Sequence, residues 1–210
     1  EEGLTVEAIA EMAGCSLATV SRKMSAFGIE ARPPWRVRYP RSDFSRSPLE
    51  KAYLVGFRLG DLTVRRAELS VDVLMTTPRQ EQVDLMHELF DRYGHVYEHH
   101  RPDDRIFLQV RLNNTFEFLL PKEDRIPDWV LADEECFFAF LAGYVDADGS
   151  IQVDRRGHAR FCVNSYDKTI LTQSQAKLVK TGIVCPPVRL DVPAGRQNNY
   201  GIISRGDYWG

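Results

Sequence analysis

Two similar segments of this 210-residue chain each end at an aspartate. These two aspartates are the residues best suited to catalysis. Residues 53–61 read Tyr-Leu-Val-Gly-Phe-Arg-Leu-Gly-Asp, and residues 140–148 read Phe-Leu-Ala-Gly-Tyr-Val-Asp-Ala-Asp. Two carboxylates brought close together repel each other at neutral pH unless a proton or a cation lies between them. Mg²⁺ prefers oxygen ligands of this kind. The pair therefore predicts metal-assisted hydrolysis of a phosphodiester, in which a metal-activated water attacks the phosphorus.

The two segments are expected to be helices that meet along their small residues. Gly56 and Gly60 in the first segment match Gly143 and Ala147 in the second, and small residues let two helix backbones approach closely. Each helix would end at its aspartate, where the negative end of the helix dipole and unpaired carbonyl groups point the same way. We expect a central helix pair related by pseudo-twofold symmetry, with both carboxylates at one end.

The likeness between the two segments continues along the chain. Each is followed by β-rich sequence, by an amphipathic helix that ends at a glycine, and by more strand-like sequence. These glycines, Gly94 and Gly182, lie 33 and 34 residues after the two aspartates. We predict an α+β fold made of two αββαββ repeats, at 48–132 and 133–210. The second repeat stops after its last candidate strand, residues 200–205, and is expected to be truncated at its C-terminal end.

Composition and charge limit the class of protein. The hydrophobic fraction of 43% and the charged fraction of 27% are typical of a soluble globular chain. No apolar run approaches the roughly 20 residues of a membrane span. The four dispersed cysteines do not suggest zinc or disulfides, so a cytoplasmic location is expected.

The net charge is −3, but the charges are unevenly distributed. Residues 31–47 form a Pro-rich linker that contains five arginines and one acidic residue, Asp43. This linker could follow a DNA backbone or minor groove, or serve only as a tether.

Residues 1–30 are expected to form a helix-turn-helix DNA-binding segment. Thr5 and Ser16 are suited to cap two short helices, with Gly14 in the turn and Gly28 after the second helix. In such a motif the second helix enters the major groove. The alternative is a helical hairpin that packs on the next domain.

A family resemblance rests on residues 141–149, Leu-Ala-Gly-Tyr-Val-Asp-Ala-Asp-Gly, which differ at two positions from the sequence that names the LAGLIDADG homing endonucleases. Residues 54–62 resemble a divergent copy of the same motif, in which Leu62 replaces the final glycine and Arg58 is expected to point away from the helix seam. The chain is thus similar to the single-chain, two-motif members of that family. The resemblance implies a saddle of two β-sheets around DNA and cleavage of both strands of a long target.

The resemblance also implies a catalytic site. Asp61 and Asp148 would bind Mg²⁺, for which Ca²⁺ or Mn²⁺ can substitute, and the carbonyl groups of Gly60 and Ala147 would assist as ligands. Asp146 faces elsewhere on the helix and is expected to act as a structural hydrogen-bonding group.

Strand alternation points to a polar face that would lie against DNA, although an ordinary solvated face fits the alternation equally. In residues 106–112, for example, Gln109 and Arg111 alternate with apolar side chains. Arg111 and Arg205 fall at similar places in the two repeats and are expected to stabilise charge on the reacting phosphate. Arg, Gln and Asn side chains can read base edges. The residues expected to contact DNA are Ser16, Leu17, Ala18, Thr19, Ser21, Arg22, Arg36, Arg38, Arg41, Arg65, Gln109, Arg111, Gln152, Asp154, Arg160, Asn164, Arg189 and Asp191.

The sequence thus predicts a monomeric, site-specific endonuclease that cuts double-stranded DNA with divalent metal. Two alternatives stay open on the same fold: a DNA-binding regulator that does not cleave, and an RNA-binding maturase. His95, His99 and His100 are expected on the surface or at the DNA backbone rather than around a metal.

Overall fold

The computed structural model describes residues 6–29, 39–197 and 203–210, and the chain divides into two compact units. The first unit consists of Glu1–Asp43 and Thr76–Asn113, and the second of Phe44–Met75 and Asn114–Gly210. These units do not coincide with the predicted repeats, whose boundaries stay a prediction. Helices and antiparallel strands are mixed in the chain, so the predicted α+β class is confirmed. Within the described ranges, no helix is long and apolar enough to cross a membrane.

The elements of the first unit are α1 (Val6–Met12), α2 (Leu17–Ala26), α5 (Gln80–Phe90), β3 (Val96–His100) and β4 (Ile106–Leu112). Strands β3 and β4 pair antiparallel, with Tyr97 opposite Gln109. Ile106, Leu108, Val110 and Leu112 of β4 are buried, as the sequence predicts. They alternate with the more exposed Phe107, Gln109 and Arg111. One face of this hairpin is therefore available for polar contacts.

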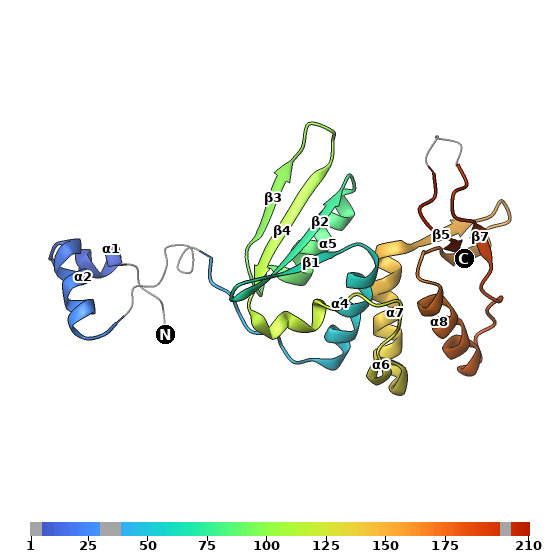
Figure 1. Cartoon of the computed structure of the whole chain (residues 1–210), viewed down its shortest axis with the longest axis horizontal. Coiled ribbons are helices and arrows are strands. Elements are labelled where there is room, and N and C mark those ends of the chain that lie inside the picture. The colour runs from blue at the N-terminus through green and yellow to red at the C-terminus, as the bar shows by residue number, and fades with distance from the viewer. Residues whose placement is uncertain (1–5, 30–38, 198–202) are drawn as a thin grey trace. The chain divides into compact units, whose positions relative to one another are not determined.

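Helices α1 and α2 form the helical pair predicted near the N-terminus (Figure 1). The Ser16 hydroxyl accepts the backbone N–H of Thr19 at 3.3 Å, which confirms the predicted cap of α2. Gly14 lies in the turn with a φ of 60°, a conformation that favours glycine. Ala10 and Val20 are the buried residues of the two helices, so this pair has a very small core.

The helices of the second unit are α4 (Pro48–Gly60), η1 (Asn114–Leu119, a 3₁₀ helix), α6 (Asp128–Ala132), α7 (Glu134–Asp148) and α8 (Lys168–Lys180). Its strands are β1 (Thr63–Ala67), β2 (Ser70–Thr77), β5 (Gly149–Val153), β6 (Ala159–Val163), β7 (Leu190–Val192) and β8 (Tyr208–Trp209), with β2 ending just past the boundary of the unit. The pairs β1–β2, β5–β6 and β7–β8 are all antiparallel.

Helices α4 and α7 lie side by side and form the centre of the second unit (Figure 1). A Cβ atom added to Gly56 would lie 2.0 Å from the carbonyl oxygen of Phe140. A Cβ atom added to Gly143 would lie 2.0 Å from the carbonyl oxygen of Tyr53. Only glycine permits this separation of the two backbones, so the predicted helix seam is confirmed and its cause is steric.

Capping residues fix where the two central helices begin. The Ser47 side chain accepts the N–H of Glu50, and Pro48 occupies the first turn of α4, where its missing N–H costs nothing. The Asp133 carboxylate accepts the N–H of Cys136 at 2.7 Å at the start of α7. With their starts fixed, both helices run to their terminal aspartates.

Arg58 holds the end of α4 from outside the seam. Its side chain is buried, and burial lowers its pKa. Its Nε donates to the carbonyl oxygen of Leu119 at 2.9 Å, and its Nη1 donates to that of Leu62 at 2.5 Å. Arg58 therefore points away from α7, as predicted, and ties η1 to the turn that follows Asp61.

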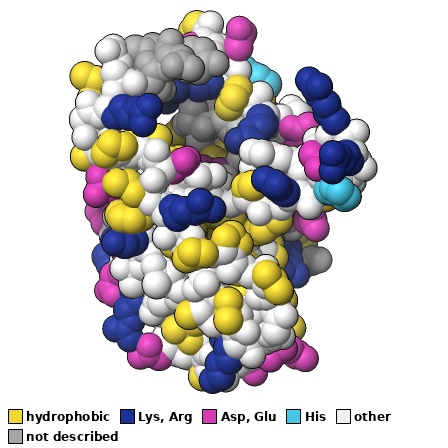
Figure 2. Space-filling model, turned by 90° about the vertical axis from the view of Figure 1, so that its right-hand side faces the viewer, with side chains coloured by type: hydrophobic (Ala, Val, Ile, Leu, Met, Phe, Trp, Pro, Cys, Tyr) yellow, Lys and Arg dark blue, Asp and Glu magenta, His cyan; other side chains and the backbone are white. Residues whose placement is uncertain are grey.

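The C-terminal strands differ from the expected pattern. Ile151 is 71% exposed and Val153 is 67% exposed, whereas the apolar side of β4 is buried. Burial depends on what packs against a strand, and β5 pairs only with β6 within the described part of the chain. Figure 2 shows one face of the molecule, on which hydrophobic side chains are exposed among Lys and Arg side chains. The candidate strand 200–205 lies partly outside the described residues, and the last strand is β8 instead.

Candidate functional site

The ends of α4 and α7 bring the predicted catalytic residues together. Asp61 caps the C-terminus of α4, and Asp148 is the last residue of α7. A Cβ atom added to Gly60 would lie 2.2 Å from the Cβ of Ala147 and 3.4 Å from Oδ2 of Asp148. The small residues of the seam thus place one carboxylate against the backbone of the other helix.

Asp148 is partly buried and lies near other negative charges, including that of Asp61. Burial raises its pKa most, and the charges of Asp61 and Asp167 raise it further, to about 6. Lys122 acts in the opposite direction and lowers it. Opposed carboxylates of this kind favour either a proton or a cation between them. A divalent cation would relieve the repulsion at neutral pH.

Lys122 is a member of the site that the sequence did not reveal. Its Nζ lies 3.5 Å from the carbonyl oxygen of Gly60, and its charge lowers the pKa of both Asp148 and Asp167. Lys122 is the only lysine between Asp61 and Asp148 in the sequence. It stands in the connection from η1 to α6, however, and nothing in the local pattern indicates that this connection returns to the end of α4.

Further tyrosine and carboxylate side chains interact around the end of α7. Tyr144 donates from its hydroxyl to Oδ2 of Asp167 at 3.4 Å. Burial raises the pKa of Asp167, and the charge of Asp124 adds to the effect. Burial likewise raises the pKa of Tyr208, and the charge of Asp148 contributes. These shifts describe an electronegative, partly dehydrated surface around the end of α7.

The types of donor atom at this site fit a magnesium-type cation. Among the residues the structure describes, no group of three or more His, Cys, Asp or Glu side chains is arranged around a common metal position. The predicted protein ligands are the carboxylates of Asp61 and Asp148 and the main-chain carbonyl groups of Gly60 and Ala147 at the helix ends. Mg²⁺ commonly uses one or two carboxylates and keeps several waters, so this set suits it better than it suits zinc.

Asp146 has the structural role that the sequence predicts. Its Oδ2 accepts the hydroxyl of Tyr53 at 2.6 Å, across the seam from α7 to α4. This bond fixes the relative position of the two helices two residues before Asp148. It therefore positions the site without being part of it.

The two arginines expected to support the transition state are not equivalent. Arg111 lies on the polar face of β4 in the first unit. Arg205 belongs to the second unit and lies in a bend before β8, outside any strand, so the expected matching strand position is wrong for it. The alternation of apolar and polar residues near the C-terminus was too short to locate the last strand, β8, from the sequence.

Several residues predicted to contact DNA have partners within the protein. Arg65 lies 3.6 Å from the buried carboxylate of Asp72. The side chain of Asn164 donates to Asp191 at 3.3 Å. Asp154 follows β5 and accepts backbone N–H groups of the next turn, which lowers its pKa. Asp154 therefore shapes the turn that follows β5.

Other predicted contact residues are placed on exposed surfaces. Gln152 and Arg160 are directly opposed in the β5–β6 hairpin, and Arg189 is also exposed. On α2, Leu17, Ala18, Ser21 and Arg22 are exposed, Thr19 is half-buried, and the Ser16 hydroxyl is engaged as a cap. Thr5, Arg36 and Arg38 lie outside the described residues.

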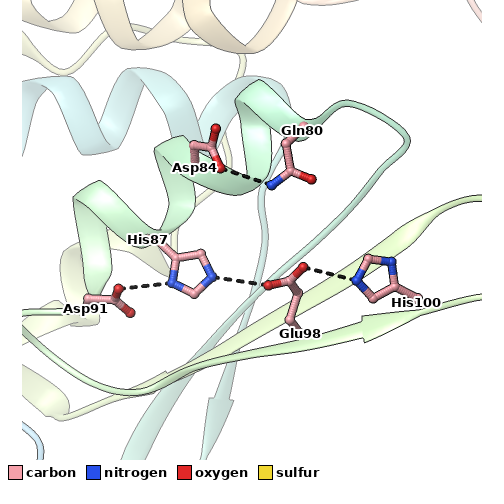
Figure 3. A network of polar contacts seen from close by, with 6 residues as sticks. All are labelled: Gln80, Asp84, His87, Asp91, Glu98 and His100. Carbon is pink, nitrogen blue, oxygen red and sulfur yellow. Dashed lines mark hydrogen bonds and ion pairs between the residues drawn. The ribbon is translucent and has the colours of Figure 1, made fainter.

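Figure 3 shows a histidine and carboxylate network between α5 and β3. His87 lies 3.0 Å from Asp91 and 3.4 Å from Glu98, and His100 lies 3.3 Å from the other oxygen of Glu98. Burial lowers the pKa of His87, but its hydrogen bonds and charge contacts with the two carboxylates outweigh this, and the net pKa is raised. His100 is thus engaged with a carboxylate on the surface.

Comparisons with known proteins identify the fold. Residues 135–208, which include the second motif, match the family model of the LAGLIDADG-like domain. A variant of I-DmoI, in complex with its nicked target DNA in the presence of manganese, matches 77% of this chain and 87% of its own, at 19% identity and a TM-score of 0.50. Full-length DUF199/WhiA from Thermatoga maritima matches 72% of this chain and 50% of its own, at 13% identity and a TM-score of 0.50. A search of curated protein sequences gave no match. At these identities the structural likeness establishes the fold alone.

Proposed function

We propose that this chain is a metal-dependent endonuclease that cuts both strands of duplex DNA at one site, because residues 135–208 match the LAGLIDADG-like domain. It acts as a monomer, since both motif helices are present in one chain. The observation that carries the proposal is the apposition of Asp61 and Asp148 at the ends of two helices in backbone contact. The I-DmoI variant, which has the same fold, is described in complex with its nicked target DNA in the presence of manganese. This supports the proposal of metal-dependent DNA cleavage.

The residues of the site have different roles in the proposed hydrolysis. Asp61 and Asp148 would hold one or more divalent cations, with Mg²⁺ as the expected ion and the carbonyls of Gly60 and Ala147 as further ligands. When bound, such a cation lowers the pKa of a water and stabilises charge on the phosphate oxygens. Lys122 adds a positive charge beside Gly60, where it can attract the phosphate group and balance the negative charge that develops on it.

The surfaces proposed to hold the DNA are basic and polar. The β3–β4 hairpin presents Gln109 and Arg111 on one face, and the β5–β6 hairpin presents Gln152 and Arg160. Arginine and glutamine side chains can contact both phosphates and base edges. The α1–α2 pair would add a further DNA-binding segment. Binding that depends on such contacts weakens steeply as salt is raised.

The first test is Mg²⁺-dependent cleavage of a randomised duplex library by the wild type and by Asp148→Asn. Asp146→Asn is the matched control, because it makes the same change on the same helix but keeps an oxygen for the Tyr53 hydroxyl. We expect double-strand cuts enriched at one long sequence with the wild type and the control, and loss of cuts with Asp148→Asn. A loss of about a hundredfold or more would match the removal of a principal electrostatic group.

A second candidate is a DNA-binding protein that does not cleave. One observation favours it: Leu62 replaces the motif's final glycine and is buried beside Asp61. This candidate predicts enrichment of one duplex sequence by binding, no cuts with Mg²⁺ or Mn²⁺, and no effect of Asp148→Asn. That result would refute the endonuclease.

A further inference from the structure

A pocket of about 190 Å³ opens within the first unit, on the polar face of the β3–β4 hairpin. The segment that precedes the hairpin in sequence contributes part of the wall, and the two strands contribute the floor. The lining residues are Tyr39, Arg41, His95, Tyr97, Gln109 and Arg111.

The register of the hairpin gathers four of these side chains on one surface. Tyr97 on β3 lies directly opposite Gln109 on β4. Arg111 lies two residues after Gln109, and residues two apart in a strand share a face. His95 comes directly before β3 and lines the same pocket. The opposite face carries Val96 and its partner Val110, both buried. The pocket floor is thus a fixed part of the hairpin.

Residues 39–43 are held beside the hairpin by specific contacts. The N–H of Ser42 donates to the carbonyl oxygen of the buried Tyr93 at 2.9 Å, and the side chain of Asn113 donates to Asp43. The ring of Tyr39 stacks on that of His95, with centroids 4.5 Å apart and planes inclined by 14°. This segment therefore forms a wall of the pocket rather than passing over it.

The chemistry of the lining defines the class of ligand. Three aromatic rings and two guanidinium groups line the pocket, and its six lining residues include no carboxylate. Rings offer a stacking surface to a planar group, and guanidinium groups bind phosphate in a bidentate manner. Gln109 adds both a donor and an acceptor. The volume is below the roughly 300–1,000 Å³ of pockets that enclose larger ligands, so the space suits one planar ring.

We infer that this pocket binds one nucleotide, with the base on the Tyr97 and Tyr39 side and the phosphate toward Arg41 and Arg111. Where the nucleotide belongs to DNA, the inference deepens the proposed function, because segment 39–43 then clamps the target strand onto the hairpin. A free nucleotide has the same chemistry, and the experiment separates the two sources.

The experiment uses the full chain in two arms. In the first arm, duplexes that contain 5-iodouracil are photo-crosslinked to the protein, and the attached peptides are sequenced. In the second arm, each of the four deoxynucleoside monophosphates is titrated while the NMR signals of His95 and Tyr97 are followed. Both arms include Tyr97→Ala, Tyr97→Phe, Arg111→Gln and, as matched control, Arg101→Gln, because Arg101 stacks over Phe107 and does not line the pocket.

We expect crosslinks on peptides that contain Tyr39 or Tyr97, and about tenfold weaker binding for Tyr97→Ala, in line with the loss of one stacked base. Tyr97→Phe keeps the ring and retains affinity, Arg111→Gln weakens binding, and Arg101→Gln leaves it near the wild-type value. Shifts of His95 and Tyr97 with monophosphates, without pocket crosslinks from duplex, identify free nucleotide as the source.

Duplex binding with crosslinks only outside the pocket, together with no shift by monophosphates, overturns the inference and leaves the proposed DNA function standing. A protein that neither binds duplex nor responds to monophosphates refutes both. Equal losses for Arg111→Gln and Arg101→Gln would also overturn it, because they would show a general charge effect.

Discussion

Replacement of Asp148 by asparagine is expected to stabilise the metal-free protein at neutral pH. The pKa of Asp148 rises from 3.8 to about 6 on folding, because of burial and then because of the charges of Asp61 and Asp167. The difference of about 2 pKa units corresponds to about 3 kcal/mol at 1.36 kcal/mol per unit. Solvent screening of this partly exposed side chain reduces the expected gain to about 1–2 kcal/mol.

The sign of the pH dependence follows from the direction of the shift. A carboxyl group with a raised folded-state pKa binds its proton more tightly in the folded state. Stability is therefore highest below the unfolded pKa of 3.8 and falls as the pH rises through about 6. The advantage of Asp148→Asn should appear at neutral pH and shrink toward zero at about pH 4, where the wild-type side chain is protonated in the folded state.

Urea unfolding in the presence of a chelator measures this effect directly. Trp129 and Trp209 both belong to the second unit, so tryptophan fluorescence can report its unfolding. Asp146→Asn serves as control and should change little. Adding Mg²⁺ or Mn²⁺ should stabilise the wild type and not Asp148→Asn, since binding to the folded state alone raises stability. An Asp148→Asn protein that is less stable than the wild type at neutral pH would refute the argument that the two carboxylates are under mutual repulsion.

Three further predictions concern the elements that position the site. Tyr53→Phe removes the bond to Asp146 and should lower the free energy of unfolding by about 0.5–1.5 kcal/mol; an unchanged urea midpoint would show that the bond contributes nothing. Gly143→Ala places a Cβ 2.0 Å from a carbonyl oxygen and should cost more than about 3 kcal/mol or prevent folding, as measured by circular dichroism; wild-type stability would mean that the helices can separate freely. Ser16→Ala removes the cap of α2 and should cost that helix about 1 kcal/mol, seen as faster amide exchange, whereas Ser21→Ala on the exposed face should not.

Local patterns in the sequence predicted the parts of the structure that depend on local interactions. Ser16 capped its helix as predicted because capping involves residues three apart. Gly56 and Gly143 met the opposite helix because matched spacing in two similar segments indicates a shared face. The outward direction of Arg58 followed from the need to keep a large charge out of that contact.

The features that the sequence did not reveal depend on tertiary structure. Lys122 approaches Gly60 only because the connection after η1 folds back to the end of α4. Alternation correctly separated the two sides of β4, whose apolar side is buried, but it could not show that both sides of β5 are exposed around Ile151. Periodicity reports which residues share a side of a strand, whereas burial depends on the element that covers that side.

The seam between α4 and α7 also has a consequence for synthesis of the protein. Asp61 and Asp148 are 87 positions apart, and the second unit is interrupted in sequence by Thr76–Asn113. A nascent chain cannot complete the seam until α7 has left the ribosome, so until then α4 exposes apolar residues such as Leu54 that are buried in the finished fold. Chains that stop before α7 should consequently be recognised by chaperones or aggregate. A ribosome-bound intermediate of that length would carry no assembled pair of carboxylates.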